Sequence, residues 1–188
     1  MTMSIDNLMT INDVRVSFPH LFTKPVFEGK LQKYSVKLLL DPVTDKSTID
    51  RIQAEIDRLL KEKNKGRKLS AEKYCLKKAP GEGEEGYRSE HEGKMVLTAT
   101  SKNRPFVVDA QRQPIHDEEE SPIYGGCRVN ARISLWFVQK AKFISCNLHA
   151  IQFHKDDEAF DGSHVDYDDA VSGFDVMSEE DAEFARGA

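Results

Sequence analysis

The chain has few cysteines and no long apolar run, and each absence excludes a class of protein. It contains three cysteines in 188 residues, Cys75, Cys127 and Cys146, without a Cys-x-x-Cys pair, which argues against a disulfide framework and a zinc ribbon. No stretch approaches the roughly 18 apolar residues of a membrane span. Residues 1–10 have no basic residue ahead of an apolar run, so no secretory signal is predicted. We therefore expect a soluble protein of a reducing cytoplasm that makes no contact with membranes.

Signatures of catalysis and of cofactor binding are missing as well. No Gly-x-Ser-x-Gly elbow is present, and no glycine-rich stretch continues into Gly-Lys-Ser or Gly-Lys-Thr. Cys146 and His149 are three residues apart on a predicted strand, so their side chains point to opposite faces and do not suggest a metal site. The acidic run 117–120 is interpreted as solvated loop surface. The sequence thus predicts no enzyme, no cofactor and no bound metal ion.

What the chain does have is a strong segregation of charge. Residues 1–154 carry 25 Lys and Arg against 20 Asp and Glu, a net charge of +5, whereas residues 155–188 carry 2 against 12, a net charge of −10. A basic body with an acidic, aromatic-dotted tail is typical of a protein that binds a polyanion and carries its own competitor for the site. A tail that only keeps the protein soluble is the alternative. We expect one domain over residues 1–154 and a disordered, flexible tail over 155–188.

Alternation of apolar residues predicts a mainly β fold. Strands are expected over the residue ranges 8–18, 31–40, 94–101, 105–110, 127–138 and 143–153. One amphipathic helix is expected over 47–65, begun by a capping box of Ser47 and Asp50 and ended at Gly66. The segment 79–93, rich in Gly and Glu, is expected to be a mobile loop. This pattern fits a small antiparallel barrel of the OB type with one inserted helix, although strand count alone does not separate a barrel from a sandwich.

Cations and aromatic residues share the expected outer faces of the long strands. Phosphates need positive charge and unpaired bases need flat apolar surfaces, so this pattern predicts an interface for single-stranded nucleic acid. The candidate residues are Lys33, Lys37, Lys94, Lys102, Arg104, Tyr124, Arg128, Arg132, Trp136, Phe143 and His149. Trp136 and Tyr124 are expected to stack on bases. The alternative is that Trp136, Phe143 and Phe153, all assigned to the outer face, lie against a second core under the helix or the 79–93 loop.

Five short motifs occur in an order that resembles a known family. They are Ser17-Phe-Pro-His-Leu-Phe22, Tyr34-Ser-Val-Lys-Leu-Leu-Leu40, Arg104-Pro-Phe-Val-Val-Asp109 with Pro114-Ile115, Tyr124-Gly-Gly-Cys127, and the strand from Ile144 to Phe153. Over residues 18–153 the chain resembles a family of tailed-phage single-stranded DNA-binding proteins, first catalogued as a domain of unknown function. The resemblance implies an OB-fold barrel that coats and protects single strands during phage DNA replication or recombination, in the cytoplasm of the infected bacterial host.

The resemblance also implies a role for the acidic tail. Such a tail competes with DNA and contacts phage or host replication proteins. Related tails often end on an aromatic residue, whereas here Phe184 is followed by four more residues, so Phe174 or Phe184 would serve as an internal anchor.

Three other functions remain as alternatives at this point. A strand-annealing recombinase also grips single strands but assembles rings or filaments. A metal-dependent nuclease would use Asp109 and the acids at 117–120, although no lysine stands in the expected relation to paired carboxylates. A purely structural phage protein would not retain DNA.

Overall fold

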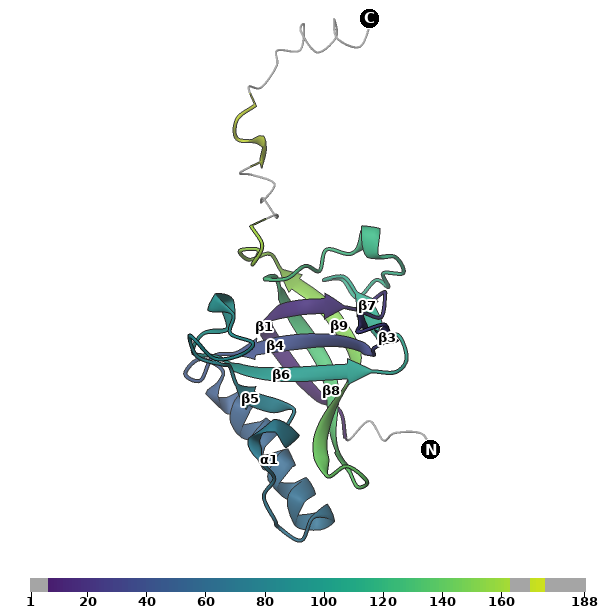
Figure 1. The fold of residues 1–188 in the computed structure, drawn as a ribbon. Helices are drawn as coiled ribbons and strands as arrows, with labels where there is room; N and C mark the ends of the chain where they lie inside the picture. Colours follow the sequence, from purple (N-terminus) through teal and green to yellow (C-terminus); the bar gives the residue numbers. More distant parts are fainter. Residues whose placement is uncertain (1–6, 163–169, 175–188) are drawn as a thin grey trace, which may run out of the picture.

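Period-two alternation of apolar residues builds five long strands, which close into a barrel (Figure 1). The structure is a computed structural model that describes residues 7–162 and 170–174. The barrel strands are β1 (Met9–His20), β4 (Tyr34–Leu40), β6 (Met95–Ser101), β8 (Arg128–Val138) and β9 (Phe143–Lys155). Neighbouring strands run antiparallel in the order β6-β4-β1-β8-β9. A parallel pairing of Thr100 on β6 with Asn147 on β9 closes the barrel.

Shorter elements extend this barrel. β5 (Leu76–Lys78) pairs with β6, β7 (Phe106–Val108) pairs in parallel with β9, and β2 (Val26–Phe27) forms a separate hairpin with β3 (Lys30–Leu31). The 3₁₀ turns are Ala71–Lys73, Ser89–His91 and Glu118–Glu120. The predicted mainly β, OB-fold-like barrel with one inserted helix is confirmed. Most of the expected disordered tail, residues 163–169 and 175–188, lies outside the described residues.

Aliphatic side chains from all five barrel strands fill the interior. Val36, Leu38 and Leu40 on β4 and Ile133 on β8 have no exposed surface. Burial of each such side chain stabilises the fold by about 1.5–3 kcal/mol. Because the interior takes alternate residues, the intervening polar side chains of β8 point outward, as the alternation predicts.

A bulge in β9 changes which residues face the core. Arg132 pairs with Ala150 but Ile133 pairs with Leu148, so His149 is an extra residue that has no partner across the ladder. Beyond the bulge the faces are exchanged: Ile151 is buried, and Phe153 packs against the core. The prediction that Phe153 lies on the outer face is therefore wrong, because a single inserted residue inverts a period-two pattern.

The inserted helix α1 (Lys46–Lys63) packs an apolar stripe against the barrel, and its start differs from the prediction. The stripe consists of Ile52, Ile56, Leu59 and Leu60. The first turn has no side-chain cap. Asp50 instead pairs with Lys46 at 2.6 Å, so the predicted capping box is absent.

The segment 79–93, expected to be a mobile loop, folds back onto the outside of β1. The ring of His91 is 2% exposed, and its Nε2 lies 2.8 Å from the hydroxyl of Ser17. The ring of Phe18 meets His91 edge to face, with centroids 6.1 Å apart. This contact fixes the last turn of the loop against the barrel.

Burial of His91 predicts an acid-sensitive contribution to stability. Burial lowers the pKa of His91, and the nearby cations of Lys37 and Arg88 act in the same direction, against Glu90. The unfolded chain therefore takes up the proton more readily, so stability is complete above about pH 6.5 and falls as the pH drops below it. His91→Gln should reduce this decline in urea denaturation between about pH 7.5 and pH 5. The exposed His116 provides a control, and His116→Gln should keep the parent's dependence. An unchanged decline in the His91 variant would contradict the assignment.

Candidate nucleic-acid interface

Closure of the barrel forms a cleft beside the last residues of β6. The Thr100–Asn147 pairing brings the loop after β6 against the outer faces of β8 and β9. The cleft has a volume of about 460 Å³. Five of the predicted site residues line it: Lys33, Lys102, Arg104, Trp136 and His149. The structure thus brings together residues that are far apart in the sequence.

Two aromatic side chains give the cleft flat apolar surface. Trp136 on β8 is 45% exposed, and Phe106 on β7 is 78% exposed. Phe106 was not among the predicted site residues. Its neighbour Val107 is buried, so the alternation within the segment 104–109 would have placed Phe106 outward. Exposed rings of this size at a cleft are suited to stacking against planar ligands.

The charge of the cleft is positive. Lys33, Lys102 and Arg104 line it, and no carboxylate among the described residues does so. The guanidinium of Arg104 lies 4.7 Å from the ring centre of Phe22 and donates to the carbonyl of His116, so two contacts orient it. A cation held in this way loses less side-chain entropy when it meets an anion.

His149 contributes hydrogen bonding more than charge. Its Nε2 lies 2.8 Å from the hydroxyl of Ser134. Burial and the nearby charge of Arg132 lower the pKa of His149, which keeps the imidazole neutral at neutral pH. Arg132, on the same outer face as Trp136, donates to the hydroxyl of Thr10 at 2.7 Å.

Three other predicted residues lie away from the cleft. The ammonium of Lys37 lies 5.5 Å from the ring centre of Phe18, on the face that the 79–93 segment covers. Lys94 binds Asp41 at 2.7 Å, and hydrogen bonds from Lys94 and nearby backbone hold the pKa of that carboxyl far below its usual range. Phe143 is half-buried at the start of β9, opposite Val138.

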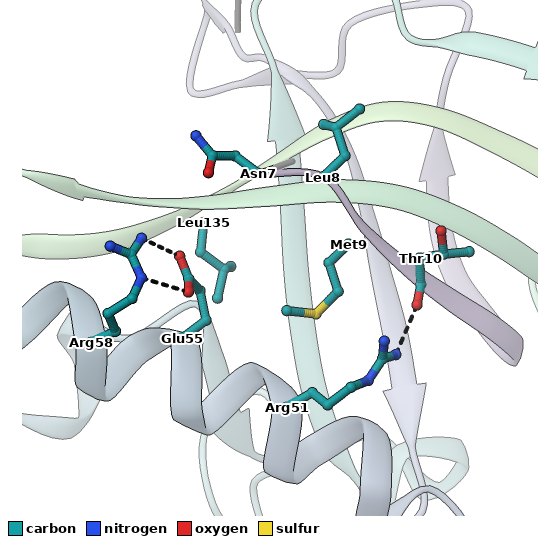
Figure 2. Close-up of a pocket in the computed structure, with 8 residues that line it drawn as sticks. All are labelled: Asn7, Leu8, Met9, Thr10, Arg51, Glu55, Arg58 and Leu135. Carbon is teal, nitrogen blue, oxygen red and sulfur yellow. Dashed lines mark hydrogen bonds and ion pairs between the residues drawn. The ribbon is translucent and has the colours of Figure 1, made fainter. Parts of the chain in front are cut away.

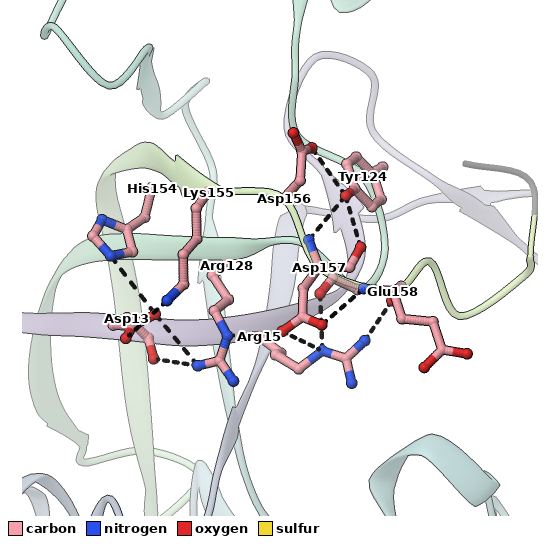
Figure 3. A network of polar contacts seen from close by, with 10 residues as sticks. Asp13, Arg15, Tyr124, Arg128, His154, Lys155, Asp156, Asp157 and Glu158 are labelled. Carbon is pink, nitrogen blue, oxygen red and sulfur yellow. Dashed lines mark hydrogen bonds and ion pairs between the residues drawn. The ribbon is translucent and has the colours of Figure 1, made fainter. Parts of the chain in front are cut away.

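Tyr124 and Arg128 belong to a polar network at the end of β9 (Figure 3). Arg128 Nε donates to Asp157 at 2.8 Å, and Arg128 Nη1 lies 3.3 Å from Asp13 Oδ1. The hydroxyl of Tyr124 donates to the carboxylate of Asp156 or the carbonyl of Asp157, at 3.0 and 2.8 Å. Burial and Asp156 raise the pKa of Tyr124 to about 12. Tyr124 and Arg128, both predicted to contact DNA, thus form hydrogen bonds with the first acidic residues after β9.

Residues 156–160, which we call the acidic strap, are packed onto the barrel. Arg15 donates to the carbonyl of Glu158 and lies 4.3 Å from the ring centre of Phe160. Gly126 has φ of +115°, and a Cβ there would come within 2.2 Å of the Glu158 carbonyl oxygen. The strap therefore needs a glycine beneath it. The expected boundary at residue 154 falls within β9, ahead of this strap.

Of the two predicted tail anchors, Phe174 and Phe184, the structure describes one. Phe174 is 77% exposed. Phe184 lies outside the described residues.

Another hollow, of about 530 Å³, separates α1 from the start of β1 (Figure 2). Both of its arginines are engaged: Arg51 donates to the carbonyl of Thr10 at 2.9 Å, and Arg58 binds Glu55 at 2.6 Å. This hollow is consequently a weaker site for an anion than the cleft.

The residues considered for metal-dependent chemistry have structural contacts. The carboxylate of Asp109 accepts hydrogen bonds from the backbone of Gln111 and Gln113, at 2.9 and 2.8 Å, and so shapes the turn after β7. Within residues 7–162 and 170–174, no three His, Cys, Asp or Glu side chains gather as a metal site would require. No helix in that part of the chain is long and apolar enough to cross a membrane.

The strap's ion pairs predict a measurable contribution to stability. Burial opposes ionisation of Asp157, but the N–H of Glu158 and the charge of Arg128 lower its pKa overall. Asp157→Asn should cost about 1 kcal/mol at pH 7, because these pairs are partly solvated. Since the folded carboxyl has the lower pKa, this difference should begin to shrink as the pH falls below about 4, and it should be lost once the folded carboxyl is protonated as well.

Glu119→Gln is the matched control, because it removes the same charge from an exposed turn. Thermal unfolding of both variants at pH 7 and pH 3.5 measures the effect. Equal losses in the two variants at pH 7 would show that the strap's ion pairs contribute nothing specific.

Comparisons with known proteins identify relatives in phages. Residues 7–185 match the family described as Enterobacter phage Enc34, ssDNA-binding protein. Putative protein p50 of Acyrthosiphon pisum secondary endosymbiont phage 1 is 29% identical over 179 residues, which cover 89% of this chain and 92% of that protein.

Solved structures agree with this match. The single-stranded DNA-binding protein from bacteriophage Enc34, in complex with ssDNA, has a TM-score of 0.72 at 30% identity, covering 83% of this chain and 90% of that one. The single-stranded DNA-binding protein gp2.5 of bacteriophage T7 is 11% identical with a TM-score of 0.51, covering 85% and 97%, and shares the fold alone. The resemblance found in the sequence is confirmed: the chain belongs to the Enc34 single-stranded DNA-binding protein family.

Proposed function

We propose that this protein binds single-stranded DNA in the cleft and coats it, without sequence preference, during phage DNA replication and recombination. The observation that carries the proposal is the composition of the cleft, where exposed rings of Trp136 and Phe106 lie among cations and no described carboxylate. Membership of a family whose Enc34 representative is described in complex with ssDNA supports it. The role is one of binding, without catalysis.

The chemistry of the cleft accounts for tolerance of sequence. Every base has a π-face, so stacking on Trp136 and Phe106 does not depend on base identity. Lys33, Lys102 and Arg104 meet phosphates, which are common to all nucleotides. Each neutralised phosphate releases counterions, so affinity should fall with salt with a log–log slope of about −0.7 per contact.

The remaining predicted contacts depend on what happens to the acidic strap. Arg128 and Tyr124 can reach DNA only after Asp157 and Asp156 leave them. A carboxylate that holds an arginine offers the same chemistry as a phosphate, which supports the proposal that acidic residues near the C-terminus compete with DNA. Direct DNA contact by Lys37, Lys94, Arg132 and Phe143 stays a prediction.

We place the protein in the cytoplasm of the infected bacterial host. Phage or host replication proteins are the proposed partners of the acidic C-terminal segment, with Phe174 and Phe184 as its anchors. Exposure of Phe174 supports this role, because single aromatic side chains surrounded by acidic residues are suited to bind a basic, apolar-lined partner surface.

Trp136 provides the first test of the cleft. If its ring stacks on a base, oligo-dT should quench its fluorescence, which reports this residue alone because the chain has one Trp. Trp136→Ala should weaken binding by about 1–3 kcal/mol, or roughly 5- to 150-fold in Kd.

The matched control is Val43→Ala, which shortens another exposed apolar side chain outside the cleft. It should leave the affinity for oligo-dT unchanged. Parent-like binding by the Trp136 variant, together with a lowered melting temperature, would place Trp136 in a structural role.

Competition by the acidic segment is tested by truncation after Gly162. This point preserves the strap, whereas a cut at residue 154 would also remove Phe160 from its contact with Leu39, Ala79 and Val96. The removed residues 163–188 contain 8 Asp and Glu against Arg186. Truncation should tighten binding to oligo-dT at low salt, because an intramolecular anion is lost, and the difference should shrink as salt screens it.

A full-length variant with those eight acids changed to Asn and Gln separates charge from length. It should bind like the truncated protein if charge is responsible. Equal affinity of the parent and the truncated protein at low salt would dispose of the competition.

A further inference from the structure

A second basic surface lies at the other end of β6 from the cleft. The cleft is next to Thr100 and Ser101, whereas β5 pairs with β6 at Met95–Leu97, next to the place where β4 ends and α1 begins (Figure 1). Seven exposed cations lie in the last turn of α1, in β5 and in the segment that joins them: Lys61, Lys63, Lys65, Arg67, Lys68, Lys77 and Lys78. We call this set the α1–β5 surface.

The α1–β5 surface is strongly unbalanced in charge. Over residues 61–78 there are eight Lys and Arg, Lys73 included, against Glu62 and Glu72, a net charge of +6. Glu62 forms an ion pair with Arg58 at 2.8 Å. Within the described part of the chain, none of the seven cations forms an ion pair. Their mutual repulsion opposes folding, so the fold itself gives no reason for gathering them.

The α1–β5 surface is joined to the cleft by the turn between β8 and β9. Lys73 Nζ donates to the carbonyl of Ala141 in this turn, at 3.3 Å. Lys140 and Lys142 flank Ala141 and are exposed. Trp136 precedes Lys140 by four residues, a distance of about 13 Å along an extended strand. Positive charge therefore continues from the cleft over this turn to β5.

We propose that a DNA strand leaving the cleft past Trp136 crosses the β8–β9 turn and lies on the α1–β5 surface, where lysines neutralise its phosphates. This inference rests on the proposed function and extends the same site. Tyr74, the one aromatic residue within 61–78, is only partly exposed, and its hydroxyl accepts from the N–H of Leu69, so binding there is mainly electrostatic and most of its bases remain unstacked. The acidic C-terminal segment is the competing occupant. Its described strap, however, engages the different cations Arg15 and Arg128.

The length of the oligonucleotide separates the two parts of the site. An oligo-dT of about 6 nucleotides fits the cleft alone, within the roughly 4–16 nucleotides that one OB fold covers, whereas about 30 nucleotides reach both parts. The test variant is Lys77→Gln with Lys140→Gln in the full-length chain. The control is Lys46→Gln with Lys155→Gln, which removes the same charge from exposed positions outside this path.

For the long oligonucleotide, the test variant should lose about 1.4 from the log–log salt slope, since each phosphate contact contributes about 0.7. The short oligonucleotide and the control variant should keep the parent's slope. An unchanged slope with the long oligonucleotide would overturn the proposal. An equal change for both lengths would also overturn it, and would assign these lysines to the acidic C-terminal segment. Failure of the short oligonucleotide to bind the parent would count against the cleft, so the two proposals fail separately.

Discussion

The parallel pairing of β6 with β9 is the constraint on which the site depends. The other contacts between barrel strands join antiparallel neighbours and could exist in an open sheet. The Thr100–Asn147 contact turns that sheet into a cylinder and brings Lys102 and Arg104 beside Trp136. Without it, β6, which leads into Lys102, and β9, which carries His149, would lie on opposite sides of the open sheet. Closure also removes two exposed sheet edges, which would otherwise invite pairing between molecules.

Carboxylates decide which cations are available to a polyanion. Lys94 and Arg128 are each held by an aspartate at under 3 Å, whereas no described carboxylate lines the cleft. A paired cation must first lose its partner before it can bind a phosphate, and that exchange yields little net energy. The pattern of pairing, more than the number of Lys and Arg, therefore indicates which cations the proposed interface can use.

The alternation of apolar residues was sufficient for the strands of the barrel, and insufficient for its closure and its irregularities. Apolar alternation predicted each barrel strand, because one face of each had to be buried. It could not predict the extra residue at His149, since whether a strand carries a bulge depends on its neighbours, and so Phe153 was assigned to the wrong face. The helix stripe was correct, but α1 begins without the expected capping box, and Asp50 pairs with Lys46 instead.

For the site, the alternation along each strand identified residues on its outer face, but it did not identify the carboxylates that pair with some of them. Trp136 and His149 were predicted from the outer faces of their strands and do lie in the cleft. Asp157 binds Arg128 at a separation of 29 residues in the sequence, and Asp41 binds Lys94 at a separation of 53. A pattern within one strand cannot predict contacts between residues so far apart. Alternation with the buried Val107 places Phe106 on the outer face, but a strand of three residues is too short for this alternation to be a clear pattern in the sequence.

The clamped strap gives whatever follows it a fixed point of attachment. Residues 163–188 begin immediately beyond the Gly126–Glu158 contact, so 26 residues are tethered next to the barrel. A ligand on a short tether acts at an effective concentration on the order of millimolar, whatever the amount of protein present. Under the proposed competition, dilution of the protein therefore weakens its encounter with DNA, whereas the effective concentration of the acidic segment stays the same. The amount of exposed single-stranded DNA would then decide how much of the protein is bound to it.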